Sequence, residues 1–156
     1  MRRGAADVLV RRLAGTASAH RRFEQFCALW LFRAGWVCDV RPIGGLTEVE
    51  RAALLLPKRD VGIDLVGRTH SGGAVAVQCK FRSASDTPVR WREIATFHSL
   101  CMRTGPWESQ VLFTTAERVV VPGRVCPQER FVTRRDLNAT LTETAVHDML
   151  DVAACM

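Results

Sequence analysis

Two β-rich segments separated by a Gly-Gly turn constrain the fold of this chain more than any other feature. Residues 63–66 read Ile-Asp-Leu-Val, and residues 74–81 read Ala-Val-Ala-Val-Gln-Cys-Lys-Phe, directly after Gly72 and Gly73. Apolar, β-branched runs joined by a glycine-containing turn are typical of an antiparallel β-hairpin. We therefore expect a hairpin here, with its turn at residues 68–73.

The hairpin carries polar side chains at one place on its otherwise apolar strands. Alternate residues of a strand share a face, so Gln78 and Lys80 lie on one side of the second strand and Cys79 lies on the core side. Asp64 stands between two apolar residues of the first strand. Antiparallel pairing brings Asp64 close to Gln78. The sequence thus predicts that a carboxylate, an amide and a lysine meet on one patch.

These residue types suit the hydrolysis of a phosphodiester. That reaction uses a hard divalent cation, held by oxygen ligands, which polarises the phosphate and lowers the pKa of the attacking water. The Asp64 carboxylate, the Gln78 amide oxygen and the backbone carbonyl of Cys79 are the candidate ligands. Lys80 is a candidate to orient the water or stabilise developing charge. Glu24, at the margin of a helical apolar stripe, is a candidate to complete the metal shell directly or through water.

The rest of the chain predicts an α/β arrangement of two or three layers. Apolar residues recur with helical spacing over residues 19–34, and Gly35 ends that helix. No repeat or long linker interrupts the sequence, so residues 1–156 are expected to form a single domain, whether whole or a fragment of a larger protein. The other expected elements are a strand at 37–40, a capped helix over 48–55, a helix from Thr87 to about Met102, strands at 111–113, 119–121 and 130–132, and a final helix capped by Thr140 and Glu143.

Basic residues are concentrated near the amino terminus. The chain has 22 Lys plus Arg against 16 Asp plus Glu, and only two of the 22 are lysines. Residues 1–59 hold 11 basic and 5 acidic side chains, so the whole surplus of +6 lies there. Such a surface attracts a polyanion in a salt-dependent way, although an ordinary soluble surface explains it equally well. For residues 1–18 we expect a solvated or phosphate-facing basic helix.

The location of the protein follows from its hydropathy and its cysteines. No apolar run approaches the roughly 18 residues that a membrane span needs. Six scattered cysteines without a C-x-x-C pair suit a reducing compartment. We therefore expect an intracellular protein with no membrane partner, cytoplasmic in a bacterium and nuclear or viral otherwise.

Residues 59–66 followed by residues 75–80 resemble the active-site hairpin of the PD-(D/E)-x-K nucleases. The likeness is greatest to the Mrr-like branch of type IV restriction endonucleases and helicase-associated nuclease domains, in which Gln replaces the usual Glu. Residues 23–36 are similar to the first helix of that branch, and residues 111–116 resemble its strand and Thr-Thr turn. The resemblance touches most of residues 20–116. It implies a restriction-endonuclease-like core, a central mixed β-sheet flanked by helices.

The resemblance also implies a Mg²⁺- or Mn²⁺-dependent deoxyribonuclease, either an endonuclease or an exonuclease, with the endonuclease favoured. The helical Glu, the metal-binding Asp, the Glu/Gln position and the catalytic Lys of the family fall on Glu24, Asp64, Gln78 and Lys80. Asp60 occupies a position that is often acidic. Val61 departs from the usual Gly-Gly-Ile-Asp run, and Gln78 carries one negative charge fewer than Glu, which should weaken metal affinity.

The residues leave two alternatives to this function. The chain can be a nuclease-fold module that binds DNA without cutting it. A thiol enzyme using Cys79 with His70 or His98 is disfavoured, because strand alternation turns Cys79 to the core.

DNA is the expected partner in either nuclease-like case. Three arginines follow the catalytic strand or begin the next helix and are candidates for phosphate contacts, namely Arg82, Arg90 and Arg92. The resemblance further implies a homodimer, or fusion to or association with a helicase-type motor.

Overall fold

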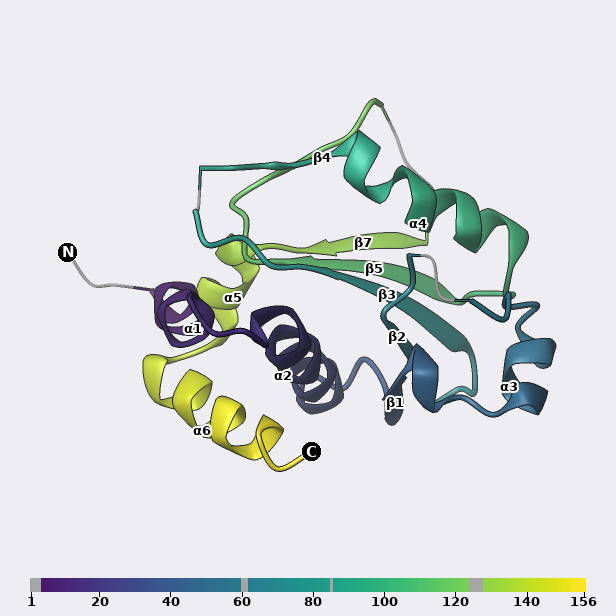
Figure 1. Cartoon of the computed structure of the whole chain (residues 1–156), viewed down its shortest axis with the longest axis horizontal. Coiled ribbons are helices and arrows are strands. Elements are labelled where there is room, and N and C mark those ends of the chain that lie inside the picture. Colours follow the sequence, from purple (N-terminus) through teal and green to yellow (C-terminus); the bar gives the residue numbers. More distant parts are fainter. Residues whose placement is uncertain (1–3, 60–61, 85, 124–127) are drawn as a thin grey trace.

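The structure is a computed structural model and describes residues 4–59, 62–84, 86–123 and 128–156. At its centre is a five-stranded mixed sheet (Figure 1). Its strands are, in spatial order, β1 (Asp39–Pro42), β2 (Leu65–Arg68), β3 (Ala74–Lys80), β5 (Ser109–Thr114) and β7 (Glu129–Val132). The first three pair antiparallel, whereas β3, β5 and β7 run parallel. The predicted hairpin is therefore present as β2 and β3.

Helices cover both faces of this sheet. The helices are α1 (Ala5–Leu13), α2 (Ala19–Arg33), α3 (Glu48–Ala53), α4 (Trp91–Arg103), α5 (Arg134–Thr140) and α6 (Glu143–Ala153). Figure 1 shows α1, α2 and α6 on one side of the sheet, α4 on the other, and α3 beside β1 and β2. None of the described helices is long and apolar enough to cross a membrane. The expected core, a mixed sheet flanked by helices, is confirmed.

Aromatic and aliphatic side chains fix the middle of the sheet from both sides. Towards α2, Phe23 packs edge-on against Phe113 of β5, with ring centroids 5.8 Å apart, and Val77 of β3 joins this cluster. Towards α4, Phe97 packs with Ala76 of β3. All five side chains are fully buried. The strand β3 is thus packed between α2 and α4 by buried side chains on both of its faces.

Several predicted boundaries were displaced by tertiary contacts. The first strand begins at Asp39, two residues later than expected, and pairs with β2. The helix expected from Thr87 begins at Trp91. Its start is delayed because Val89 and Arg90 form a short strand, β4 (Val89–Arg90), which pairs in parallel with β6 (Val119–Val120). The Glu93 carboxylate then accepts a hydrogen bond from the Arg90 N–H and caps the helix.

The cap of the last helix was also predicted incorrectly. Thr140 ends α5, and Thr142 caps α6 by accepting a hydrogen bond from the Ala145 N–H. The prediction missed α5 itself, a short helix that begins at Arg134. By contrast, Thr47 and Glu50 form the predicted reciprocal cap of α3.

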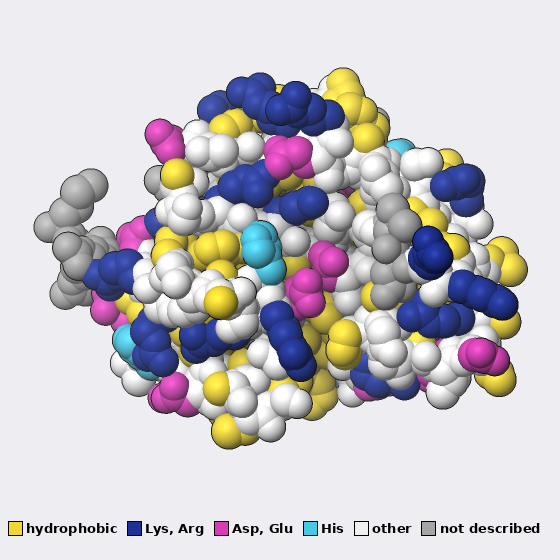
Figure 2. Space-filling view, viewed as in Figure 1, with side chains coloured by type: hydrophobic (Ala, Val, Ile, Leu, Met, Phe, Trp, Pro, Cys, Tyr) yellow, Lys and Arg dark blue, Asp and Glu magenta, His cyan; other side chains and the backbone are white. Residues whose placement is uncertain are grey.

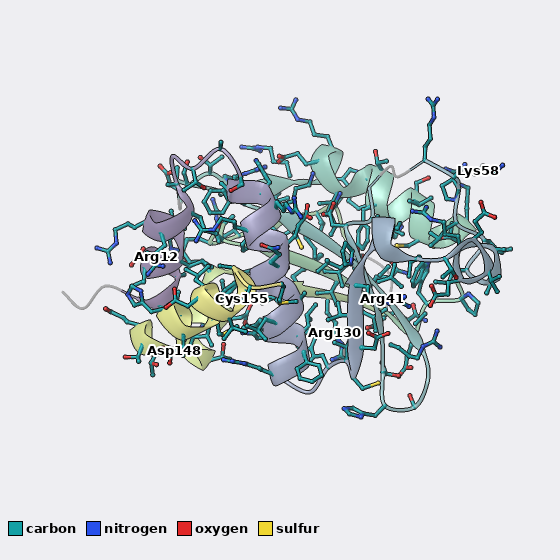
Figure 3. The ribbon with its side chains drawn as sticks, turned by 60° about the horizontal axis from the view of Figure 1, so that its bottom comes forward. Arg12, Arg41, Lys58, Arg130, Asp148 and Cys155 are labelled. Carbon is teal, nitrogen blue, oxygen red and sulfur yellow. The ribbon has the colours of Figure 1, made fainter. Side chains whose placement is uncertain are left out.

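The basic N-terminal segment packs into the molecule. The apolar face of α1 is buried against α5 and α6. Arg12 donates to the Nδ1 atom of His147 at 2.6 Å and forms an ion pair with Asp151 at 3.3 Å, and Figure 3 shows it where α1 meets α6. Part of the basic surface predicted to face a phosphate is thus occupied by intramolecular contacts.

Replacing Phe23 by Ala should lower the free energy of unfolding by about 3–5 kcal/mol, because it leaves a cavity between α2 and the sheet. Phe32 lies on the same helix but is 54% exposed. Phe32→Ala should change the free energy by no more than about 0.5 kcal/mol. Urea unfolding of both variants measures the difference. Similar losses in the two variants would contradict the described packing of α2.

Candidate active site

The end of β3 is open on one side. Register pairing between β2 and β3 stops at Leu65 and Val77. Residues 78–80 continue β3 but keep a strand partner only on the β5 side. An open strand end of this kind leaves backbone groups for other partners. The predicted site residues lie at this place.

Asp64 occupies the position that a continued β2 would fill. Its N–H donates to the Val77 carbonyl at 2.8 Å, and its own carbonyl accepts from the Ile43 N–H at 3.0 Å. Its Oδ2 atom accepts a hydrogen bond from the Cys79 N–H at 2.7 Å. Gly62, with φ +101°, lets the chain turn into β2 in a conformation that other residues rarely adopt. The carboxylate is thereby fixed against the edge of β3.

The two sides of Cys79 face different surroundings. Because the N–H and C=O of a strand residue point to the same side, its carbonyl lies on the side of Asp64. Its thiol packs with the α2-side core, which also contains Cys27. Burial raises the pKa of both thiols. The core orientation predicted for Cys79 is confirmed, and a raised pKa does not suit a nucleophilic thiol.

Glu24 enters the site from α2. It lies in the second turn of that helix and is half-buried. Burial, and then the nearby Asp64 carboxylate, raise the pKa of Glu24 to about 7, although Arg21 acts in the opposite direction. The contribution of Asp64 means that the two carboxyl groups lie within electrostatic reach of each other. The structure therefore brings Glu24 and Asp64 together.

Gln78 is the most buried of the site residues, with 5% of its surface exposed. Its Oε1 atom is buried and has no hydrogen-bond partner among the residues that the structure describes. An unpaired buried amide oxygen costs about 1–3 kcal/mol. This cost is removed if a ligand or ion binds the oxygen.

Two threonines hold the last residues of β3, a role that the sequence did not reveal. The Thr114 hydroxyl donates to the Lys80 carbonyl at 2.7 Å. The Thr115 hydroxyl accepts from the Arg82 N–H at 2.7 Å and donates to the Arg82 carbonyl at 2.8 Å. The sequence sign of this role is the Thr-Thr pair at the end of a buried strand. It can be interpreted only when β5 is known to lie beside β3.

A third carboxylate, Glu93 of α4, lies near Lys80 and was not predicted. It forms a part-buried ion pair with Arg82. Burial acts to raise the pKa of Glu93, but the Arg90 N–H, the Arg82 guanidinium and the Lys80 ammonium together lower it. Lys80 therefore lies within electrostatic reach of an ionised carboxylate.

The predicted phosphate contacts are not equivalent in the structure. Arg82 is engaged with Glu93, whereas the side chains of Arg90 and Arg92 are exposed at the start of α4. Asp60 lies outside the described residues. Within the described ranges, no group of three His, Cys, Asp or Glu side chains is placed to hold a metal ion. A metal here needs the Gln78 amide and a backbone carbonyl besides the two carboxylates.

Charged side chains of both signs lie on the face of the molecule shown in Figure 2. Acidic side chains lie near the middle of that view, over the region between α2 and the strands above it in Figure 1, with Lys and Arg side chains around them. A polyanion approaching this face would meet basic side chains around the acidic ones.

Comparison with solved structures shows the fold alone. The fold is similar to that of the DNA modification-dependent restriction endonuclease AspBHI, with a TM-score of 0.61 and 21% identity over 97% of this chain and 39% of that one. It is also similar to the ATP-dependent Type ISP restriction-modification enzyme LlaBIII bound to DNA, with a TM-score of 0.60 and 16% identity over 88% of this chain and 8% of that one. The chain thus spans well under two thirds of AspBHI and less than a tenth of LlaBIII.

Comparison of the sequence with protein families identifies the chain more directly. None of the curated proteins compared with it matches. A family described as a restriction endonuclease, Mrr_cat_2, matches residues 46–145, more than half of the chain. This match includes the open end of β3, Asp64, Gln78 and Lys80. The chain therefore belongs to the Mrr_cat_2 restriction endonuclease family.

Proposed function

We propose that the chain is a Mg²⁺- or Mn²⁺-dependent deoxyribonuclease that cuts phosphodiester bonds within DNA. One observation carries this proposal. Two carboxyl groups, Glu24 and Asp64, lie within electrostatic reach of each other, and Gln78, which follows the Asp64-bound Val77 on β3, has a buried side-chain oxygen with no hydrogen-bond partner among the described residues. Such an arrangement is costly without a cation and is favourable with one. The DNA-bound and DNA-modification-dependent enzymes with similar folds support DNA as the substrate.

The residues at the open strand end fit a hard divalent cation. Glu24, Asp64, Gln78 and the Cys79 carbonyl offer only oxygen donors, which Mg²⁺ and Mn²⁺ prefer. When bound there, the cation supplies Lewis acidity to a phosphate oxygen and to the attacking water. The hydrogen bond from the Cys79 N–H orients the Asp64 carboxylate for this role.

The side chains around this position have separate tasks in the proposed reaction. Lys80 donates hydrogen bonds to the attacking water or to a phosphate oxygen, where its positive charge stabilises the negative charge that grows as the phosphodiester is attacked. Glu24 accepts a proton from the water or holds it by a hydrogen bond. The exposed Arg90 and Arg92 bind flanking phosphates and so position the DNA.

The similar enzymes are much longer than this chain, which supports a multi-part assembly. We propose that the nuclease acts inside the cell as a homodimer or together with a helicase-type motor. A single active site cuts one DNA strand at a time, and either arrangement provides a way to cut both DNA strands.

Asp64→Asn and Lys80→Ala should each lower the rate of DNA cleavage in Mg²⁺ by about 100-fold or more, because one weakens cation binding and the other removes charge stabilisation. Lys58→Ala is the matched control. Lys58 is the only other lysine, lies exposed before β2 (Figure 3) and should be dispensable. Cleavage of plasmid DNA measures the rates. Full activity in Asp64→Asn or Lys80→Ala would refute the proposed site, and an inactive wild type that binds DNA would favour a binding module.

Gln78→Glu should lower the Mg²⁺ concentration that gives half-maximal cleavage, because it adds a negative charge to the cation site. The two side chains have almost the same shape, so the change tests charge alone. Cleavage rates over a Mg²⁺ titration, compared with those of wild type, give the shift. An unchanged or higher half-maximal concentration would argue against Gln78 as a ligand.

Stability in the absence of metal should depend on pH through Glu24. Its pKa is about 7 in the folded protein against a usual value of 4.5, so the folded state binds the proton more tightly. The free energy of unfolding should therefore fall as the pH rises from about 4.5 to about 7. Glu24→Gln should remove this contribution.

Urea unfolding in EDTA at several pH values measures this effect. The difference in unfolding free energy between Glu24→Gln and wild type should grow with pH over that range. Glu48→Gln, at an exposed position on α3, serves as the control. A difference that stays constant with pH would show that Glu24 does not titrate as described.

A further inference from the structure

A second group of buried polar atoms lies on the α4 face of the sheet. Glu129 begins β7, and its side chain is only 1% exposed. Neither of its carboxylate oxygens has a hydrogen-bond partner among the described residues. The Oε1 atom of Gln110 is buried without such a partner as well, and Gln110 is the register partner of Glu129 on β5. The two side chains therefore lie next to each other on neighbouring strands.

His98 of α4 faces the same point. Its Nδ1 atom is buried without a hydrogen bond and lies 3.7 Å from Oε2 of Glu129. The imidazole ring packs against Trp91, about two helical turns earlier on α4, with ring centroids 5.3 Å apart. This packing limits the ring's freedom to turn Nδ1 away from the carboxylate.

The buried atoms of this cluster are nearly all acceptors. Two oxygens of Glu129 and one of Gln110 are acceptors only, and Nδ1 of His98 is an acceptor in one of the two neutral tautomers. Buried acceptors without a donor lose their hydration, and among the described residues only an ion pair between His98 and Glu129, formed when the imidazole carries a second proton, offsets this loss. The neighbouring Arg130 does not compensate them, because its guanidinium lies over Trp36 on the opposite face of the sheet.

The separation of Nδ1 and Oε2 is informative. At 3.7 Å it is too long for a hydrogen bond. Two ligands that each lie about 2.1 Å from a tetrahedral ion are about 3.4 Å apart. The observed spacing is therefore close to that of two ligands on one ion.

We propose that His98, Gln110 and Glu129 bind one divalent cation of the zinc class, at a site separate from the oxygen-ligand site at Asp64. Three protein ligands, one imidazole nitrogen and two side chains with oxygen donors, match the usual ligand number of an open zinc site. The nitrogen ligand favours Zn²⁺ or Co²⁺ over Mg²⁺, which prefers oxygen and an octahedral shell. The two sites thus have different metal preferences.

The three proposed ligands come from three different elements. Because they lie on α4, β5 and β7, the ion would tie α4 to the edge of the sheet.

Zinc uptake by the metal-free protein tests this proposal. The wild type, dialysed against Zn²⁺ with an excess of Mg²⁺, should bind one tightly held Zn²⁺ per chain, and its thermal midpoint should rise. Glu129→Gln and His98→Gln should each weaken this binding by about tenfold or more. Glu129→Gln removes a buried charge while keeping the shape, so the metal-free variant should fold, as circular dichroism can show.

The controls separate this site from the others. Asp64→Asn should keep the tight Zn²⁺, because it alters only the oxygen-ligand site, and His70→Ala, at an exposed turn residue, should also keep it. Co²⁺ in place of Zn²⁺ should give a visible absorption band that disappears in His98→Gln, without the near-ultraviolet absorption of thiolate ligands. The proposal is overturned if the wild type takes up no Zn²⁺, if Glu129→Gln binds as tightly as wild type, if Asp64→Asn loses the ion, or if thiolate absorption appears instead.

Discussion

The hydrogen bond from the Cys79 N–H to the Asp64 carboxylate is the contact on which the candidate active site depends. β2 ends before β3 does, and a carboxylate takes the place of the missing strand. The same contact satisfies a backbone donor and fixes an acidic group beside a backbone carbonyl. The strand end is therefore stabilised by the group that we propose to be a metal ligand, so structure and chemistry share one interaction.

The helices on the two faces of the sheet place carboxylates with different neighbours near the end of β3. From one face, Glu24 of α2 adds a second carboxyl group, whose raised pKa reflects burial and the charge of Asp64. From the other face, Glu93 of α4 pairs with Arg82. Negative charge is thus concentrated where a metal ion is proposed. The positive charge of Arg82, which follows β3, is neutralised by Glu93. The layered fold makes this possible, because it packs both helices against one pair of parallel strands, β3 and β5.

The sequence predicts well what local pattern determines, and less well what depends on contacts between distant segments. The hairpin and the cap at Thr47 follow from turn glycines and side-chain spacing, and both are present. The start of α4 was misplaced because Val89 pairs with a strand thirty residues away, which no local pattern encodes. α5 was missed because its seven residues carry too weak a periodicity.

The candidate site shows the same division. Strand alternation grouped Asp64, Gln78 and Lys80, and the apolar stripe of the helix over 19–34 pointed to Glu24, which the family resemblance then matched. The supporting residues Thr114 and Glu93 were not found, because their relation to β3 exists only after β5 and α4 have packed against it. Residues that hold a site in place are recruited by tertiary structure, and a single sequence gives little sign of them.

Lys80, one of only two lysines in the chain, lies in different surroundings from the nearby Arg82. Twenty of the chain's 22 basic residues are arginines, and Arg82 shows what arginine does here, since it forms an ion pair with Glu93. Lys80, two residues earlier, is half-buried, and its ammonium group forms no ion pair or hydrogen bond with the described residues. A compact ammonium can approach a water or phosphate oxygen from a narrow space, whereas a planar guanidinium needs a partner of matching shape. At the end of β3, the arginine therefore lies beside a fixed carboxylate, and the lysine lies where we propose that the partner is a transient substrate.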